Sequence, residues 1–156
     1  MRIRQQLMLM CALMVFVCHN AVSQSKIQKQ PLPLVHYNDN VNLPVTPSEM
    51  AKLKEVYGEN LQKLVLDRPQ RIKDIKNILR NRVEIKQFKA NETKPCPLLS
   101  EVPLLDYYVS TLMRDTNFNP TTFNPLKYQF NFYGTGASMY KVDNTNYYII
   151  IKSQHQ

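Results

Sequence analysis

The chain has 156 residues, of which 44% are hydrophobic, 21% are charged and 10% are aromatic, and its net charge is +8 at pH 7. This is the composition of an ordinary globular protein, and it excludes collagen-like, coiled-coil and wholly disordered chains. Three glycines are too few for a glycine-rich phosphate loop, and no apolar run reaches the roughly 18 residues of a membrane-spanning helix.

The first 23 residues have the pattern of a cleaved secretory signal peptide. Arg2 and Arg4 precede the apolar run Leu7–Cys18, and small residues at Ala21 and Ser23 mark a cleavage site before Gln24. The alternative is an uncleaved anchor, but a 12-residue run is about 18 Å long as a helix, well short of a roughly 30 Å hydrocarbon core. The sequence therefore predicts a secreted, extracellular protein.

Residues 24–45 are polar, contain three prolines and lack a sustained period. We expect them to form an extended or disordered N-terminal arm. Residues 46–156 are then long enough for a single domain with its own core.

Two helices joined at Asp67–Pro69 are predicted to form a hairpin. Thr46, Pro47 and Glu49 make a helix start with a capping box, and Gly58 should weaken the first helix by about 1 kcal/mol relative to alanine. The second helix is expected to run from Asp67 to about Phe88. The apolar positions of the two helices at helical spacing are Met50, Leu53, Val56, Tyr57, Leu61, Leu64, Ile72, Ile75, Leu79 and Val83.

A third helix is predicted from about Glu101, with its apolar face formed by Val102, Leu105, Tyr108, Val109, Leu112 and Met113. Alternating or β-branched residues then predict strands at 126–133, 137–142 and 147–151. The last strand is so apolar that its edges must be covered. Together these elements predict an α+β fold, in which a helical hairpin and a third helix pack on a C-terminal three-stranded antiparallel β-meander.

The positive charge is concentrated between Arg68 and Lys94, which hold nine basic and three acidic residues. Such a segment is a candidate binding site for an anionic partner. The alternative is a solvated amphipathic helix whose basic side chains flank its apolar stripe. The candidate anion-binding residues are Arg68, Arg71, Lys73, Lys76, Arg80, Arg82, Lys86 and Lys89.

Two residues of the following linker are candidates for covalent modification. Asn91 lies in the one usable N-x-Ser/Thr sequon, so it is a candidate glycosylation site. Cys96 lies between two prolines and is the one cysteine left after signal cleavage. In an oxidising compartment we expect it to form an intermolecular disulfide, for example in a covalent homodimer, or else to be buried or capped.

No set of residues predicts an enzyme. His36 falls in the expected arm and His155 is next to the last residue, so neither should be held as a general base must be. Cys96 has no neighbouring histidine, and no acidic pair has calcium-loop spacing. We therefore expect no catalytic residues, no metal, no cofactor and no nucleic-acid partner.

Three functions fit these observations. The first is a secreted, non-enzymatic protein that binds another macromolecule, either an extracellular protein or a glycosaminoglycan. The second is a structural constituent of an extracellular coat, crosslinked through Cys96 and some of the nine tyrosines. The third is a host-defence protein that acts on anionic surfaces through residues 68–94.

Overall fold

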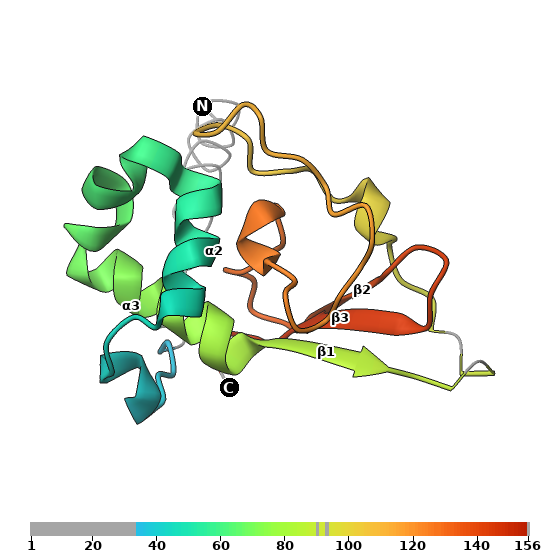
Figure 1. The fold of residues 1–156 in the computed structure, drawn as a ribbon. Helices are drawn as coiled ribbons and strands as arrows, with labels where there is room; N and C mark the ends of the chain where they lie inside the picture. The colour runs from blue at the N-terminus through green and yellow to red at the C-terminus, as the bar shows by residue number, and fades with distance from the viewer. Residues whose placement is uncertain (1–33, 90, 93, 156) are drawn as a thin grey trace, which may run out of the picture. The chain divides into compact units, whose positions relative to one another are not determined.

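Two helical segments and a three-stranded sheet supply most of the regular structure in the computed structural model (Figure 1), which describes residues 34–89, 91–92 and 94–155. These residues belong to one compact unit, Pro33–Gln156. The predicted α+β class is confirmed. The predicted signal peptide, residues 1–23, lies outside the described residues. No helix among the described residues is long and apolar enough to cross a membrane.

Helix α2 (Pro47–Tyr57) begins at the predicted capping box. The Thr46 hydroxyl accepts a hydrogen bond from the Glu49 amide at 3.2 Å, and the Glu49 carboxylate accepts one from the Thr46 amide at 2.8 Å. Proline at the first helical position is harmless because its missing N–H would have no partner there. A 3-10 turn at Gly58–Asn60 and a π turn at Gln62–Leu66 extend the segment.

Gly58 differs from the expectation of an ordinary, slightly unfavourable helical glycine. It ends α2 with a φ of +51°, a positive value that favours glycine over residues with a Cβ. A Cβ placed there would lie 3.0 Å from Val109 Cγ2. Glycine therefore suits this position for two independent reasons.

Helix α3 (Pro69–Asn77) and a π turn at Ile78–Arg82 form the second helical segment. Arg80, in this π turn, bonds to Glu49 at the start of α2, so the end of the second segment lies next to the start of the first. The expected continuation to Phe88 is wrong, because strand β1 takes Val83–Gln87. Val83 and Ile85 are β-branched and face Ile151 and Ile149 across the sheet, a pairing that overrides the helical spacing.

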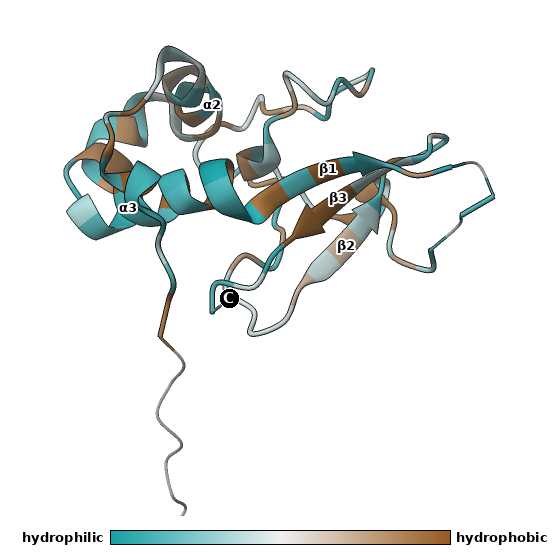
Figure 2. Ribbon diagram, turned by 90° about the horizontal axis from the view of Figure 1, so that it is seen from below, coloured by the Kyte–Doolittle hydropathy of each residue, from teal (hydrophilic) through white to brown (hydrophobic). Residues whose placement is uncertain are grey.

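The sheet has the order β1-β3-β2, with β2 at Ser138–Lys141 and β3 at Tyr147–Ile151. The predicted hairpin of the last two strands is confirmed, with Tyr140 paired to Ile149. As expected from its apolar sequence, β3 has no free edge: it lies between the other two strands (Figure 2). The predicted meander is wrong, because the third strand comes from residues 83–87 and not from 126–133.

Residues 126–133 form no named strand, although their alternating burial is the predicted one. Leu126, Tyr128, Phe130 and Phe132 are buried in the core. Their backbone neighbours lie in residues 103–105: the Leu105 amide donates to the Lys127 carbonyl, and the Gln129 amide donates to the Pro103 carbonyl. Lys127, expected on the polar face, is buried and bonds to Asp115 at 2.7 Å and Glu55 at 3.1 Å.

The predicted helix from Glu101 is also wrong, because only a 3-10 turn at Leu99–Glu101 forms. The pairing of residues 103–105 with 127–129 holds this part of the chain extended and removes it from helical geometry. Within residues 106–111, two tyrosines and β-branched Val109 and Thr111 have weak helix propensity. Tyr108 and Met113, expected in the core, are exposed.

Of the predicted N-terminal arm, residues 24–45, the first ten residues lie outside the described part of the chain, and residues 34–45 pack against the domain. A 3-10 helix at Asp39–Asn42 buries Val41 to 1% exposure. The His36 amide donates to the Gln154 carbonyl at 2.8 Å, and the Tyr37 hydroxyl donates to Asp74. Burial and this bond raise the pKa of Tyr37 to about 12. Asn40, Asn77 and Asn81 add side-chain hydrogen bonds that periodicity does not reveal.

Candidate functional site

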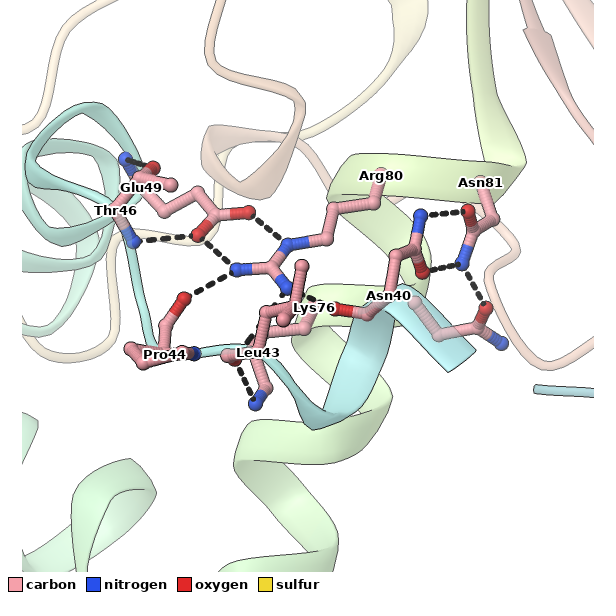
Figure 3. Close-up of polar contacts among 9 residues, drawn as sticks. Asn40, Leu43, Pro44, Thr46, Glu49, Lys76, Arg80 and Asn81 are labelled. Carbon is pink, nitrogen blue, oxygen red and sulfur yellow. Dashed lines mark hydrogen bonds and ion pairs between the residues drawn. The ribbon is translucent and has the colours of Figure 1, made fainter. Parts of the chain in front are cut away.

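The basic residues of the segment 68–94 are spread over several elements and do not form one face. Arg80 is used inside the molecule (Figure 3). Its Nε donates to Glu49 at 2.5 Å, and its Nη2 donates to Glu49 at 2.6 Å and to the Pro44 carbonyl at 2.8 Å. Its Nη1 donates to the carbonyls of Asn40 and Leu43. Arg80 therefore joins the π turn after α3 to α2 and to the segment before α2.

Arg82 is buried, with 6% of its surface exposed. Its Nε donates to the Lys152 carbonyl at 3.1 Å, and its Nη2 donates to the Phe132 carbonyl. Burial lowers the pKa of this guanidinium, since desolvation disfavours its charged form. A polyanion in solvent has little access to a charge in this position.

Three more basic residues contact the protein itself. Lys76 donates to the Leu43 carbonyl at 2.8 Å, and Lys73 Nζ lies 4.5 Å from the centre of the Tyr37 ring. Arg71 donates to the hydroxyls of Tyr133 and Tyr57. The exposed members of the predicted set are Arg68 before α3, Lys86 on β1, where it pairs with Glu84 at 3.0 Å, and Lys89.

The two candidate modification residues lie on the surface loop after β1. Asn91 is exposed, as a glycosylated asparagine must be, while Thr93 of its sequon lies outside the described residues. Cys96 is half-buried, with Sγ 3.5 Å from the Lys94 carbonyl, and burial raises the pKa of its thiol. A raised pKa leaves less thiolate and slows disulfide exchange. The intermolecular disulfide stays a prediction.

A polar cleft of about 400 Å³ lies between the turn at residues 142–145 and residues 114–118. Its charged groups are already partnered. Arg114 donates to the carbonyls of Leu99 and Val102, and Asp115 pairs with Lys127. Asp143 accepts from the hydroxyl and amide of Ser100, which lowers the pKa of its carboxyl. Groups satisfied in this way have little capacity left for a ligand.

Among the described residues, the most exposed aromatic and thioether side chains are on the segment where a helix was expected. Tyr107 is 73% exposed, Met113 is 75% exposed and Tyr108 is 41% exposed. We call these three residues the aromatic loop. Tyr108 stacks on Tyr57 with ring centres 5.4 Å apart, which anchors the loop to the end of α2. The adjacent tyrosines Tyr107 and Tyr108 were the available sequence signal, but Tyr108 and Met113 were assigned to the apolar face of a helix.

His155, which we expected to be too close to the end of the chain to be held in place, is fixed. Its Nδ1 lies 3.1 Å from the Leu34 carbonyl. Within residues 34–89, 91–92 and 94–155, no three side chains of His, Cys, Asp and Glu lie together as metal ligands would. Comparison with known protein families, curated proteins and solved structures gives no match for this chain.

Proposed function

We propose that the protein is a secreted, non-enzymatic protein that acts by binding another extracellular protein through its aromatic loop. The exposure of Tyr107 and Met113, at 73% and 75%, supports this proposal most directly. Tyrosine and methionine are enriched in the buried parts of protein interfaces, and loops held by a rigid scaffold commonly carry binding residues. A partner that covers both side chains removes apolar surface from water.

A protein partner is favoured over a glycosaminoglycan by the way the basic segment is used. Arg80 and Arg82 donate their hydrogen bonds to the protein's own carbonyls and to Glu49. The same observation weighs against the host-defence hypothesis, which needs a dense cationic surface free to meet an anionic one.

The second candidate, an extracellular coat constituent, has one observation in its favour. Tyr107 and Tyr133 are the most exposed tyrosines of the described residues, at 73% and 53%. Oxidative crosslinking of such side chains, or a disulfide through Cys96, would hold the protein in an insoluble matrix. If the protein is recovered in the soluble fraction and runs as a monomer on a non-reducing gel, this candidate is excluded.

Crosslinking mass spectrometry on the secreted protein in its native fluid tests the proposal. We expect the protein in the soluble extracellular fraction with Gln24 at its N-terminus, and crosslinks from residues 103–113 to one partner. Detection of peptides from residues 1–23 in that fraction would overturn secretion by signal cleavage. Crosslinks that map away from the aromatic loop would overturn the proposed surface.

Matched variants make the surface test quantitative. Tyr107→Ser and Met113→Ser should each weaken capture of the crosslinked partner by at least about tenfold if they are central to the interface. Leu43→Ser removes an exposed apolar side chain elsewhere, on the segment that packs against α3, and should change capture little. Equal effects of all three variants would contradict an interface at the aromatic loop.

A further inference from the structure

An apolar cavity of about 180 Å³ lies between the helical segments within residues 47–82 and residues 126–133. Arg71, on α3, is the one charged residue in its lining, and Tyr57, Tyr128, Tyr133 and Gln129 supply the other polar groups. The remaining lining side chains are Ile75, Ile78, Leu105, Leu126, Phe130 and Phe132. Apolar walls with a few converging polar groups are the usual composition of a small-molecule site.

Among the residues that the structure describes, Arg71 has no acidic partner. All twelve acidic residues of the sequence fall among the described residues, and none of the five ion pairs there includes Arg71. Its bonded acceptors are the hydroxyls of Tyr133, at 2.8 Å from Nη1, and Tyr57, at 3.2 Å from Nη2. A guanidinium against apolar walls without a counter-charge favours an anion beside it.

The two tyrosines complete a site for a carboxylate. Each hydroxyl accepts a hydrogen bond from Arg71 and keeps its own proton, which it can donate to a ligand oxygen. Arginine binds carboxylates with two parallel hydrogen bonds, so the planar group of the ligand matches the planar group of the side chain.

The volume limits the rest of the ligand. An apolar cavity of about 150 Å³ can hold benzene, so a cavity of about 180 Å³ holds one ring or a short alkyl chain and little more. We propose that this cavity binds a small carboxylate with an aromatic or short alkyl body, with the carboxylate at Arg71 and the body against Ile75, Ile78 and Phe130. This site is distinct from the protein surface proposed above, because none of the three residues of the aromatic loop lines the cavity.

Titration of the purified full chain with benzoate tests the site, with benzyl alcohol and benzylamine as neutral and cationic probes of similar size. Methyl NMR signals of Ile75 and Ile78 report occupancy of the cavity. We expect saturable shifts with benzoate, binding of benzyl alcohol weaker by about tenfold or more, and no binding of benzylamine, since a charge-assisted hydrogen bond is lost. Equal affinity for benzoate and benzyl alcohol would overturn the proposal, and so would the absence of saturable shifts with benzoate.

The variants Arg71→Met and Arg68→Met distinguish binding at Arg71 from a general effect of positive charge. Arg71→Met keeps an unbranched side chain and should make the affinities for benzoate and benzyl alcohol about equal. Arg68→Met removes an exposed charge just before the same helix and should leave the preference for benzoate unchanged. A preference that survives Arg71→Met would contradict the assignment. If that variant does not fold, the comparison of the three probes on the unaltered protein decides the question alone. Loss of partner capture in Tyr107→Ser without loss of benzoate binding would show that the two sites are independent.

Discussion

Arg80 shows how a basic side chain can be structural rather than available to a partner. Its guanidinium donates to both carboxylate oxygens of Glu49 and to the carbonyls of Asn40, Leu43 and Pro44 (Figure 3). The side chains of Arg80 and Glu49 are each only 12% exposed. In such a position, removal of one partner leaves the other charge without compensation, which is strongly destabilising.

The Glu49–Arg80 pair should make the stability of the protein depend on pH. Its hydrogen bonds to Arg80, above all, lower the pKa of Glu49 from 4.5 to about 2. A carboxylate with a lowered folded-state pKa adds stability above pH 4.5, and this stability is lost as the pH falls from 4.5 toward 2. We expect the contribution of this pair to the free energy of unfolding to fall by about 2 kcal/mol between pH 7 and pH 3.

Urea denaturation at pH 7 and pH 3 measures this loss. In Glu49→Gln the free energy of unfolding should be lower at pH 7, and its fall toward pH 3 should be smaller by about 2 kcal/mol. Glu59→Gln, which changes an exposed glutamate in the 3-10 turn after α2, is the matched control and should behave as the unaltered protein does. If the free energy of unfolding of Glu49→Gln falls toward pH 3 as steeply as that of Glu59→Gln, Glu49 is not the source of the pH dependence.

At the scale of elements, the sequence was most informative where local chemistry and tertiary contacts agree. The capping box of Thr46 and Glu49, the start of a second helix at Pro69 and the pairing of β2 with β3 each form as predicted. In each case a cap, a proline or a two-residue period determines the structure locally, and the neighbouring segments support the same choice.

Prediction failed where the partner of a segment decides its structure. Val83 and Ile85 fit a helical stripe as well as a strand, and only the presence of β3 beside them decides for the strand. Residues 126–133 have the alternation of a strand, but their neighbour is the 103–105 segment and not the sheet. For the same reason the exposure of Tyr108 and Met113 was not predicted, since the local sequence does not show whether another segment covers these side chains.

At the end of α2, replacing Gly58 with alanine should destabilise the protein, whereas helix propensity alone predicts stabilisation. In a regular helix, Gly→Ala is stabilising by about 1 kcal/mol. Because Gly58 has a φ of +51° and its missing Cβ would lie 3.0 Å from Val109 Cγ2, Gly58→Ala should instead lower the free energy of unfolding by about 1–3 kcal/mol. Gly136→Ala, at a glycine with nothing within 4 Å of its Cβ position, is the control and should change it by less than about 0.5 kcal/mol. A thermal melt in which Gly58→Ala is more stable than the unaltered protein would show that this turn is helical in solution.

For the whole molecule, the distribution of charge matters more than its sum. The formal net charge is +8, and nine basic residues fall between Arg68 and Lys94. The fold divides them: Arg80 and Arg82 are held inside, Arg71 borders an apolar cavity, Lys73 and Lys76 contact neighbouring segments, and Arg68, Lys86, Lys89 and Lys94 are exposed. Exposed charges farther apart than the Debye length, about 8 Å at physiological salt, are largely screened from one another.

From this distribution of charge we expect weaker binding to heparin than the sequence alone predicts. We expect the protein to elute near or below about 0.15 M salt, because five of the eight candidate anion-binding residues contact the protein itself and exposed charges are screened at this salt. Lys86→Gln and Lys89→Gln should lower the elution salt, since these side chains are exposed. Lys76→Gln should lower it less, because Lys76 donates to the Leu43 carbonyl at 2.8 Å and packs against the segment before α2. Retention well above 0.15 M salt that disappears in a folded Lys76→Gln variant would instead restore a continuous anion-binding face on α3.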